Sequence, residues 1–258
     1  MKLLKLLLLA TATMSILTAC GGSDDDDLDD RLNIADPKLR FVHAVPAGPN
    51  VTLYRNGNAE ADATDVGYKY ASQYYDIGEG NSALELKTAD GAISVGSNSF
   101  DAQRGHKYTS VALIGDGKAD VMLVDDPYNK GITSDNARVR VVNAAFNAQN
   151  VDVYLTDPGV DLATQTARFA AVPYKTAKPD SGSDSEELEG QTYQIRVTEA
   201  GTQNVIFNAT ADLPANADWL LLVVPADGIG ALVPNNVKVL VAKSDDDTKA
   251  TLELTNTP

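Results

Sequence analysis

The chain has few of the side chains on which much enzyme and metal chemistry depends. Its 258 residues include one cysteine, two histidines and one tryptophan. A single cysteine excludes a disulfide within the chain, so Cys20 needs an explanation of its own. Because Cys20 is the only cysteine and belongs to the N-terminal segment, thiol catalysis is excluded. His43 and His106 are the only histidines, so a zinc site rich in His or Cys is excluded as well.

Basic residues are scarce as well. The chain has 21 Lys and Arg against 36 Asp and Glu, which gives a formal net charge of −15. Nucleic-acid binding needs a basic surface that neutralises phosphates, so this balance excludes a nucleic-acid partner. Anionic surfaces of other kinds should also repel the protein.

Two further patterns are missing. No stretch repeats its apolar residues at the spacing of an amphipathic helix, which argues against an α/β architecture. No Gly-x-Ser-x-Gly elbow is present to signal a serine nucleophile, and the nearest match, at residues 80–84, lies in a hairpin context. Carboxylates are abundant, but nothing in the sequence places two of them at the separation that a glycosidase needs.

The N-terminus begins with a leader. Residues 1–19 carry Lys2 and Lys5, then an apolar run that stops at small residues, which favours a cleaved signal peptide over a transmembrane helix. The sequence Leu17-Thr18-Ala19-Cys20-Gly21 resembles the lipobox of bacterial lipoprotein precursors. This resemblance implies lipidation of Cys20, cleavage before it and acylation of the new amine. It predicts membrane anchoring in the cell envelope, with the outer membrane favoured if the host is Gram-negative.

An acidic segment follows at residues 20–36. Its glycines and its run of aspartates cannot bury enough apolar surface to offset chain entropy, and the charges repel one another. We therefore predict a disordered spacer between the lipid and the folded part. A calcium-binding tract is the alternative, but the segment lacks the spaced ligands and the glycine turn of a defined site.

The rest of the chain uses one plan twice. Residues 40–54, with Arg40-Phe41-Val42-His43-Ala44, return as residues 140–154, with Arg140-Val141-Val142-Asn143-Ala144. This repeat predicts a first domain at residues 37–127 and a second at 137–258, each large enough for its own core. The short polar segment between them predicts two separate domains joined by a short hinge.

The sequence pattern of both predicted domains is typical of β-strands. Leu39, Phe41 and His43 alternate with polar or opposite-facing neighbours, and residues 193–198 alternate in the same way in the second copy. Residues 108–114 and 219–224 are more uniformly apolar, as central strands covered on both faces should be. The fold class predicted is all-β, with two tandem antiparallel β-sandwiches of immunoglobulin-like type.

The opening strands resemble a known family. The run Arg40-Phe41-Val42-His43-Ala44-Val45-Pro46, followed by Asn50-Val51-Thr52-Leu53-Tyr54, is similar to the signature of the domain of unknown function DUF4397. Such domains occur in bacterial secreted proteins and lipoproteins, often in tandem. The second copy departs from the signature at Asn143 and Phe146. The resemblance implies a fold, a location and a duplication, and no activity.

Few residues remain as candidates for a site. His43 shares a face with Leu39 and Phe41, and its replacement by Asn143 in the second copy predicts a structural role, because an amide cannot shuttle protons. His106, in a polar turn, is expected to be solvated. A tyrosine cluster offers rigid contact area for a partner, although packing as cross-strand pairs is an equal alternative; it comprises Tyr68, Tyr70, Tyr74 and Tyr75.

The acidic loop at residues 180–187 lacks the glycine and glutamate of a hand-type calcium site, so a solvated loop is predicted. No cofactor or metal is expected. Two functions stay open: a non-catalytic, lipid-anchored envelope protein that presents its domains to a protein or glycan, and a hydrolase that uses loop carboxylates on an envelope polymer. The sequence does not fix the oligomeric state.

Overall fold

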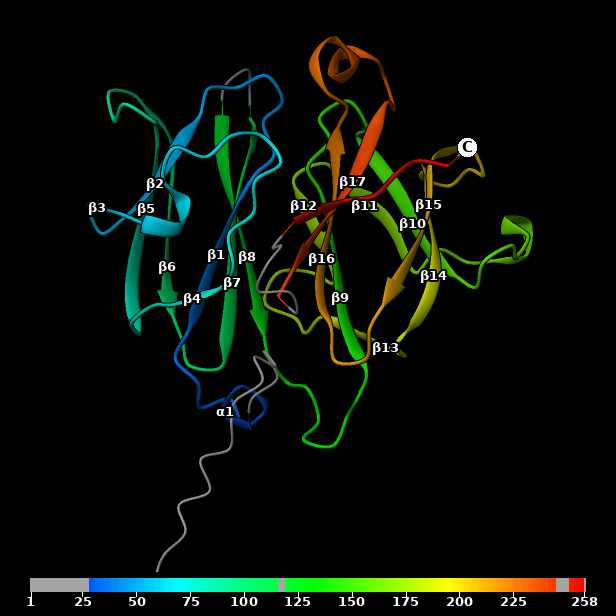
Figure 1. Cartoon of the computed structure of the whole chain (residues 1–258), viewed down its shortest axis with the longest axis horizontal. Coiled ribbons are helices and arrows are strands. Elements are labelled where there is room, and N and C mark those ends of the chain that lie inside the picture. Colours follow the sequence, from blue (N-terminus) through cyan, green and yellow to red (C-terminus); the bar gives the residue numbers. More distant parts are fainter. Residues whose placement is uncertain (1–27, 116–118, 245–250, 258) are drawn as a thin grey trace, which may run out of the picture.

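The computed structural model describes residues 28–115, 119–244 and 251–257, and nearly all the regular secondary structure in this part of the chain is strand (Figure 1). The first half comprises α1 (Leu28–Arg31), β1 (Lys38–His43), β2 (Val51–Arg55), β3 (Asn58–Ala59), η1 (Ala61–Ala63), β4 (Tyr75–Asp76), β5 (Gly80–Thr88), β6 (Ser94–Ala102), β7 (His106–Ile114) and β8 (Ala119–Pro127). Among the described residues, no helix is both long and apolar enough to cross a membrane.

The second half repeats this order with a few additions. It comprises β9 (Ala137–Asn143), β10 (Asn150–Thr156), η2 (Leu162–Thr164), β11 (Phe169–Pro173), β12 (Thr176–Lys178), β13 (Glu186–Leu188), β14 (Gln191–Glu199), β15 (Val205–Leu213), β16 (Asp218–Pro225), η3 (Gly228–Leu232), β17 (Val237–Lys243) and β18 (Thr251–Glu253). The three η segments are short 3-10 helices between strands, of three residues each in η1 and η2 and five in η3.

Each half is a sandwich of two sheets. In the first half the inner sheet has the order β4-β1-β7-β8 and the outer sheet the order β3-β2-β5-β6. In the second half the inner sheet is β12-β9-β16-β17-β18, with β13 also paired to β9, and the outer sheet is β11-β10-β14-β15. The predicted all-β sandwich architecture is confirmed. Most pairs are antiparallel, whereas β1 with β7 and β9 with β16 are parallel.

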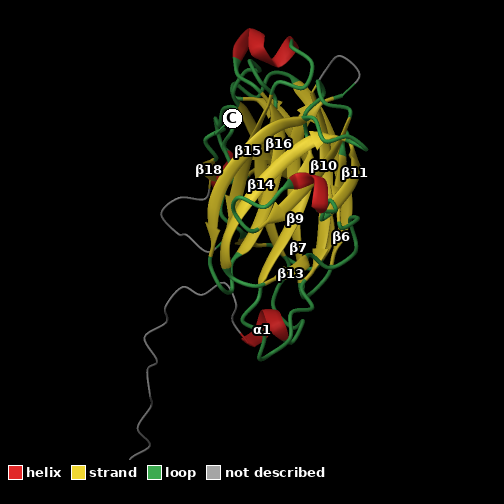
Figure 2. Ribbon diagram, turned by 90° about the vertical axis from the view of Figure 1, so that its right-hand side faces the viewer, coloured by secondary structure: helices red, strands yellow, loops and turns green. Residues whose placement is uncertain are grey.

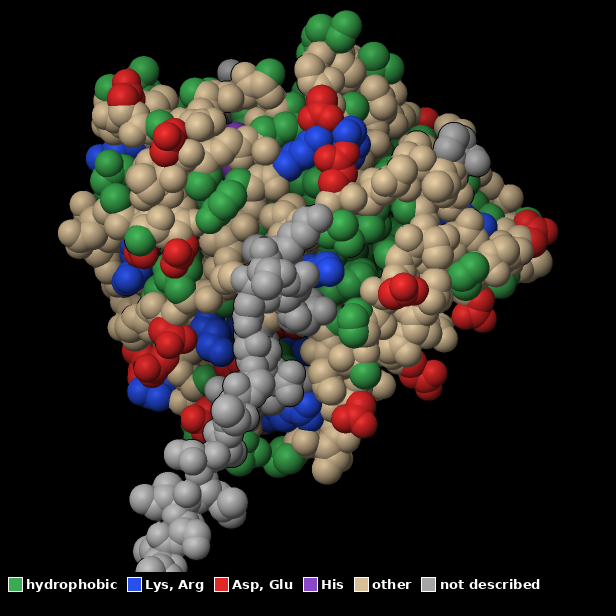
Figure 3. Space-filling view, in the orientation of Figure 1, with side chains coloured by type: hydrophobic (Ala, Val, Ile, Leu, Met, Phe, Trp, Pro, Cys, Tyr) green, Lys and Arg blue, Asp and Glu red, His purple; other side chains and the backbone are tan. Residues whose placement is uncertain are grey.

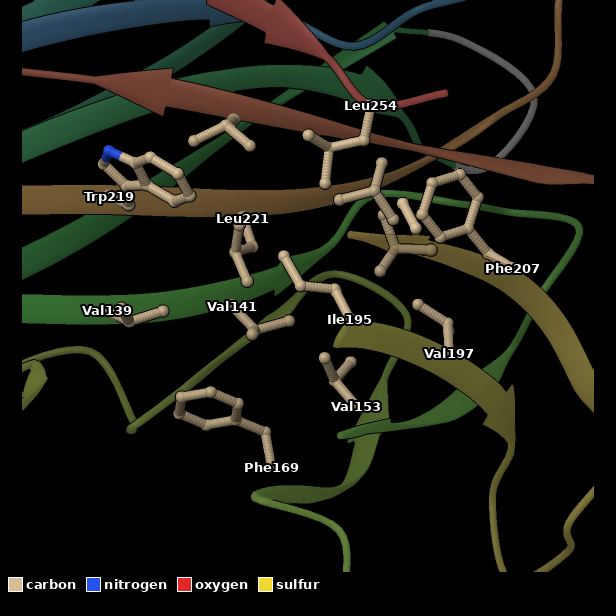
Figure 4. Close-up of a cluster of buried hydrophobic side chains, with 14 of the residues drawn as sticks. Val139, Val141, Val153, Phe169, Ile195, Val197, Phe207, Trp219, Leu221 and Leu254 are labelled. Carbon is tan, nitrogen blue, oxygen red and sulfur yellow. The ribbon is translucent and has the colours of Figure 1, made fainter. Parts of the chain in front are cut away.

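The alternation read from the sequence places one core inside each sandwich. In the first half Leu39 and Phe41 of β1 pack against Leu53, Leu84 and Leu86 of the outer sheet. In the second half the corresponding core contains Val139, Val141, Ile195, Phe207 and Trp219 (Figure 4). These side chains belong to both sheets of their half, so each core holds its sandwich together.

A third core joins the two halves. The opposite faces of the inner sheets meet through buried side chains of both, among them Val42, Val111, Leu113, Val142, Leu220 and Leu222. The molecule is thus four sheets deep, with the two sandwiches side by side in Figure 1, and Figure 2 looks onto the outer sheet of the second half. The prediction of two separate domains joined by a hinge is wrong, because a buried apolar interface fixes one half against the other.

Matching contacts on the two sides give this interface an approximate twofold character. The hydroxyl of Tyr68 donates to the carbonyl of Pro225, at the end of β16. The hydroxyl of Tyr174 donates in turn to the carbonyl of Ile114, at the end of β7. Because β7 and β16 hold the same place in their sheets, each half reaches across to the other in the same way.

The segment that leads into β1 differs from the predicted spacer. Residues 28–31 form the short helix α1, and Asp30 is buried, with its carboxylate 2.9 Å from the ammonium of Lys38 and 3.6 Å from that of Lys107. These ion pairs offset the repulsion and chain entropy that the acidic composition implied. The predicted signal peptide, Cys20 and the aspartates up to residue 27 lie outside the described residues.

Candidate functional site

A groove of about 450 Å³ opens at one edge of the second half. Its walls are β15, the start of β16, the end of β17 and the C-terminal segment, and its lining includes Thr210, Asp212, Trp219, Lys243, Glu253 and Thr255. On the face shown in Figure 3, hydrophobic side chains lie in a hollow to the right of the grey atoms. We call this feature the C-terminal groove.

One residue difference explains why this edge is open. Phe207 of β15 stands opposite Val197, and the same register position of the first half holds Gly96, opposite Leu86. A Cβ at Gly96 would lie 3.0 Å from the side chain of Val121 in β8, so the glycine lets β6 approach β8 closely. The phenyl ring of Phe207 instead fills the second core and holds the two sheets apart at this edge.

The groove offers both donors and acceptors of hydrogen bonds, and the largely buried indole of Trp219 forms part of its lining. The ammonium of Lys243 lies 5.6 Å from the ring centre of Trp219. Asp212 accepts a hydrogen bond of 2.5 Å from the hydroxyl of Thr192, on the neighbouring strand. Threonine hydroxyls of β15 and of the C-terminal segment add groups that both donate and accept.

Glu253, at the rim of the groove, is held as a carboxylate. Its oxygens lie within ion-pair distance of Lys69 and of Lys238. Partial burial raises the pKa of Glu253, but hydrogen bonds from Lys238 and Lys69 outweigh the burial and set the pKa below its ordinary value. An ionised carboxylate can accept hydrogen bonds from a ligand, but it cannot act as a general acid.

A second hollow of about 400 Å³ lies across the C-terminal residues from the first. It is lined by Gln194, Arg196, Val205, Ile206, Phe207, Asn208 and Asn256. Asn208 holds the chain end between the two hollows, since its amide donates to the carbonyl of Thr257 and its backbone NH binds the side chain of Asn256. The face beside β15 is therefore a band of mixed polar and apolar side chains with the C-terminal segment along its middle.

A buried cluster of charges lies between the halves, apart from the groove. Asp126 accepts from the Nη2 atoms of Arg138 and Arg140, each at 2.9 Å, while Asp218 lies 3.3 Å from the ammonium of Lys107. Burial raises the pKa of Asp218, but the charges of Arg138 and Lys107 outweigh it and lower the pKa. Paired in this way, the charges fix the relative position of the sheets rather than form a reactive site.

The predicted solvated loop at residues 180–187 closes over this cluster. Arg140 donates to the carbonyls of Pro179, Asp180 and Ser183, and the Ser185 hydroxyl donates to Asp126 at 2.7 Å. Residues 180–184 are exposed on their outer side, as expected, but Ser185 is buried. The loop contributes backbone acceptors to a guanidinium, which its acidic composition did not indicate.

His43 has the structural role predicted for it. It is buried, its Nδ1 accepts from the backbone NH of Val45 at 3.3 Å, and its Nε2 lies 3.3 Å from the carbonyl of Pro49. Asn143 repeats this arrangement, since its Oδ1 accepts from Ala145 NH and its Nδ2 donates to Ala148. Burial lowers the pKa of His43 against the opposing hydrogen bond to Pro49, so the ring stays neutral.

His106 is more engaged than the sequence indicated. It begins β7, and its Nδ1 lies 2.7 Å from the carboxylate of Asp125 on β8. Its ring also stacks on Tyr108, with the ring centres 5.9 Å apart. The turn residues 103–105 do not leave it free in solvent, because the β7–β8 pairing brings the carboxylate alongside.

The four tyrosines are half-buried, and their side chains have different partners. Tyr68 binds across the interface, Tyr70 donates to the carbonyl of Asp62, and Tyr74 stacks under Arg40 with its hydroxyl 3.2 Å from Thr109. The Tyr75 hydroxyl is buried in the first half. Cys20 lies outside the described residues, within which no group of three or more His, Cys, Asp or Glu side chains could hold a metal ion.

The C-terminal groove and the charge cluster escaped the sequence reasoning. In the sequence, Trp219 is only part of an apolar strand. No motif near it indicates that it lies beside the C-terminal segment. A signal for the cluster did exist: Arg40 and Arg140 each interrupt an apolar strand at the same repeat position, where a buried charge requires a partner.

Comparisons with known proteins find weak structural similarity over most of the chain and a family match over part of it. Structural similarity is found to alpha-glucan-recognising family 41 carbohydrate-binding modules of streptococcal virulence factors, at 11% identity and a TM-score of 0.25, covering 72% of this chain and 94% of that one. Structural similarity is also found to the family 26 module CBMbc of Eubacterium rectale Amy13K in complex with maltoheptaose. The sequence identity is 10% and the TM-score 0.26, and the match covers 82% of this chain and 99% of that one. These likenesses are too weak to assign a ligand.

By sequence, no curated protein matches the chain. The match to a family covers β1 to β8 of the first half and runs on into β10 of the second. Residues 37–154 match the domain of unknown function DUF4397.

Proposed function

We propose that the protein is a non-catalytic, lipid-anchored binding protein of the bacterial cell envelope, which binds a glycan of the envelope in the C-terminal groove. The observation that carries this proposal is the groove itself, a concave site lined by two carboxylates, one ammonium and several hydroxyls beside the largely buried indole of Trp219. Sugar hydroxyls both donate and accept, so they match a lining of this mixed kind.

The proposal also includes how the chain is organised and held. We infer that residues 137–258 form a second, more divergent DUF4397-like domain after a first at residues 37–127. The equal strand order of the two halves supports this inference. Lipidation of Cys20 would place both at a membrane surface, in the outer membrane if the host is Gram-negative.

A hydrolase that uses the same groove is the less favoured function. Asp212 and Glu253 both line it, but a glycosidase needs one carboxyl group that stays protonated until it donates. Glu253 is ionised between two lysines, with a lowered pKa. Release of new reducing ends from a bound polysaccharide would favour the hydrolase over the binder.

Binding to an array of envelope oligosaccharides tests the groove. Thr210→Trp would fill it from an exposed position of β15. Ser99→Trp is the matched control, because Ser99 is exposed at the same register position of β6, which approaches β8. We expect Thr210→Trp to lose glycan binding and Ser99→Trp to retain it; equal binding by both variants would contradict the proposal.

Intact mass and membrane fractionation test the anchor separately. The wild-type protein should begin at an acylated Cys20 and sediment with membranes, whereas Cys20→Ser should stay soluble. If both proteins are soluble with the same unlipidated N-terminus, the anchoring is wrong, while the groove can still bind its ligand.

A further inference from the structure

Exposed aliphatic side chains gather at the end of the molecule where the described chain begins. Leu28 and Leu32, one turn apart at α1, are 58% and 45% exposed, and Ile34 follows at 51%. Ile132, in the segment that joins the two halves, is 57% exposed. Aliphatic side chains this exposed contribute nothing to the cores, so a cluster of them marks a contact surface.

Hydrogen bonds hold these residues on one rigid surface. The guanidinium of Arg31 donates to the carbonyls of Gly131, Ile132 and Ser134, at 2.9, 2.8 and 3.0 Å, and so ties α1 to the joining segment. The backbone carbonyl of Ile34 accepts from Arg104 at 2.8 Å. We call Leu28, Leu32, Ile34 and Ile132 the basal patch.

The basal patch lies opposite the other exposed apolar tip of the molecule. In Figures 1 and 2, α1 is at the lower end, whereas η3, with Ile229 and Leu232, is at the upper end (Figure 1, orange). Cys20 precedes Leu28 by eight positions. Eight residues span at most about 28 Å, so a lipid on Cys20 would keep this end of the molecule near the bilayer.

We propose that the basal patch inserts into the interfacial region of the membrane to which the protein is anchored, and so sets the orientation of both sandwiches. This inference rests on the lipid anchor of the proposed function. The surface it fits is zwitterionic, because charges of both signs surround the patch and the chain carries a net charge of −15. Asp29 and Arg31 lie in α1, and Asp36 pairs with Arg104 at 3.1 Å.

A lipid surface suits the patch better than a second copy of the chain. A stable protein interface buries roughly 800 Å² on each partner from about 20 to 30 residues, whereas the patch offers four aliphatic side chains. The tether also raises the effective concentration of lipid at this end, so weak insertion suffices. With the patch seated, the end that carries η3 points away from the membrane.

Spin labels on the lipidated protein in phosphatidylcholine vesicles test the seat. A label on Thr133→Cys reports beside Ile132 without altering the patch, and one on Pro234→Cys reports at the opposite end. We expect the label at 133 to be more accessible to oxygen than to a water-soluble nickel chelate, and the label at 234 to show the reverse. Aqueous exposure at both positions would overturn the proposal.

Variants distinguish insertion of the basal patch from anchoring through the lipid on Cys20. Leu28→Ser with Leu32→Ser should move the label at 133 into water while the protein still floats with the vesicles. The matched control, Ile229→Ser with Leu232→Ser, should leave that label in the interface. Loss of flotation by the unaltered protein would refute the anchor, whereas coupling between labels at 133 of two molecules would show that a second copy occupies the patch and would overturn the inference.

Discussion

Replacing Asp126 with alanine removes the carboxylate that joins two buried guanidinium groups. Its oxygens accept from Arg138 and Arg140, each at 2.9 Å, and from the backbone NH and the hydroxyl of Ser185, at 3.2 and 2.7 Å. Both arginine side chains are only 2% exposed, so neither can recover a water shell without opening the interface. The substitution therefore leaves the buried guanidinium of Arg140 without its carboxylate, while Arg138 keeps the more distant Asp218, at 3.4 Å.

The expected loss is large. Removing one partner of a buried ion pair costs about 3–5 kcal/mol, and a domain is stable by only about 5–15 kcal/mol. Asp180→Ala is the control, since Asp180 is 72% exposed and its carboxylate meets Lys178 at 2.8 Å. An exposed pair contributes about 0–1 kcal/mol.

Urea unfolding, followed by the fluorescence of Trp219 and by far-UV circular dichroism, measures both variants. We expect the midpoint of Asp126→Ala to fall well below those of the wild type and of Asp180→Ala, in both signals. If Asp126→Ala loses no more than Asp180→Ala, the cluster does not hold the halves together and the reasoning from burial is refuted.

Other substitutions probe single features by the same unfolding measurement. The lowered pKa of His43 means that the unfolded chain takes up the proton first, so the stability from the neutral ring is complete above about pH 6.5 and falls as the pH drops below it. His43→Asn should flatten the stability profile between pH 7 and 5, and an unchanged slope would argue against a neutral buried ring. Gly190→Ala should cost about 1–3 kcal/mol, because its Cβ would lie 2.4 Å from a backbone nitrogen, while Gly78→Ala has open space and serves as control. Tyr68→Phe and Tyr174→Phe should each cost about 0.5–1.5 kcal/mol for a hydrogen bond across the interface, and unequal losses would contradict its twofold character.

Strand periodicity was enough to predict the sandwich cores. Leu39, Phe41 and His43 point into the first core because alternate side chains of a strand share a face, and the local pattern carries that information. The exchange of His43 for Asn143 likewise indicated a structural role, since both side chains can bind the turn that follows their strand.

The interface could not be predicted in the same way. Residues 108–114 are mostly apolar, which indicates that both faces of the strand are covered but not what covers the second face. The partners of the charge cluster lie far apart in the sequence: Lys107 meets Asp218, and Arg40 donates to the carbonyl of Ala242. Such contacts depend on how two sheets dock, and no local spacing encodes them.

The C-terminal groove depends on context in another way. Phe207 and Gly96 are ordinary strand residues in the sequence, and their consequence appears only when each is seen at the same register position of its sandwich. The acidic composition before β1 also misled, because Lys38 and Lys107 neutralise Asp30 from outside the segment.

The single tryptophan allows one direct test of the binding account. Trp219 lines the C-terminal groove, and its indole NH gives one resonance in a ¹H–¹⁵N spectrum. Titration with a glycan that the protein retains should shift this resonance to saturation, and Thr210→Trp should abolish the shift of the Trp219 signal. A glycan that binds while the Trp219 indole resonance stays unmoved would contradict the assignment of the groove as the binding site.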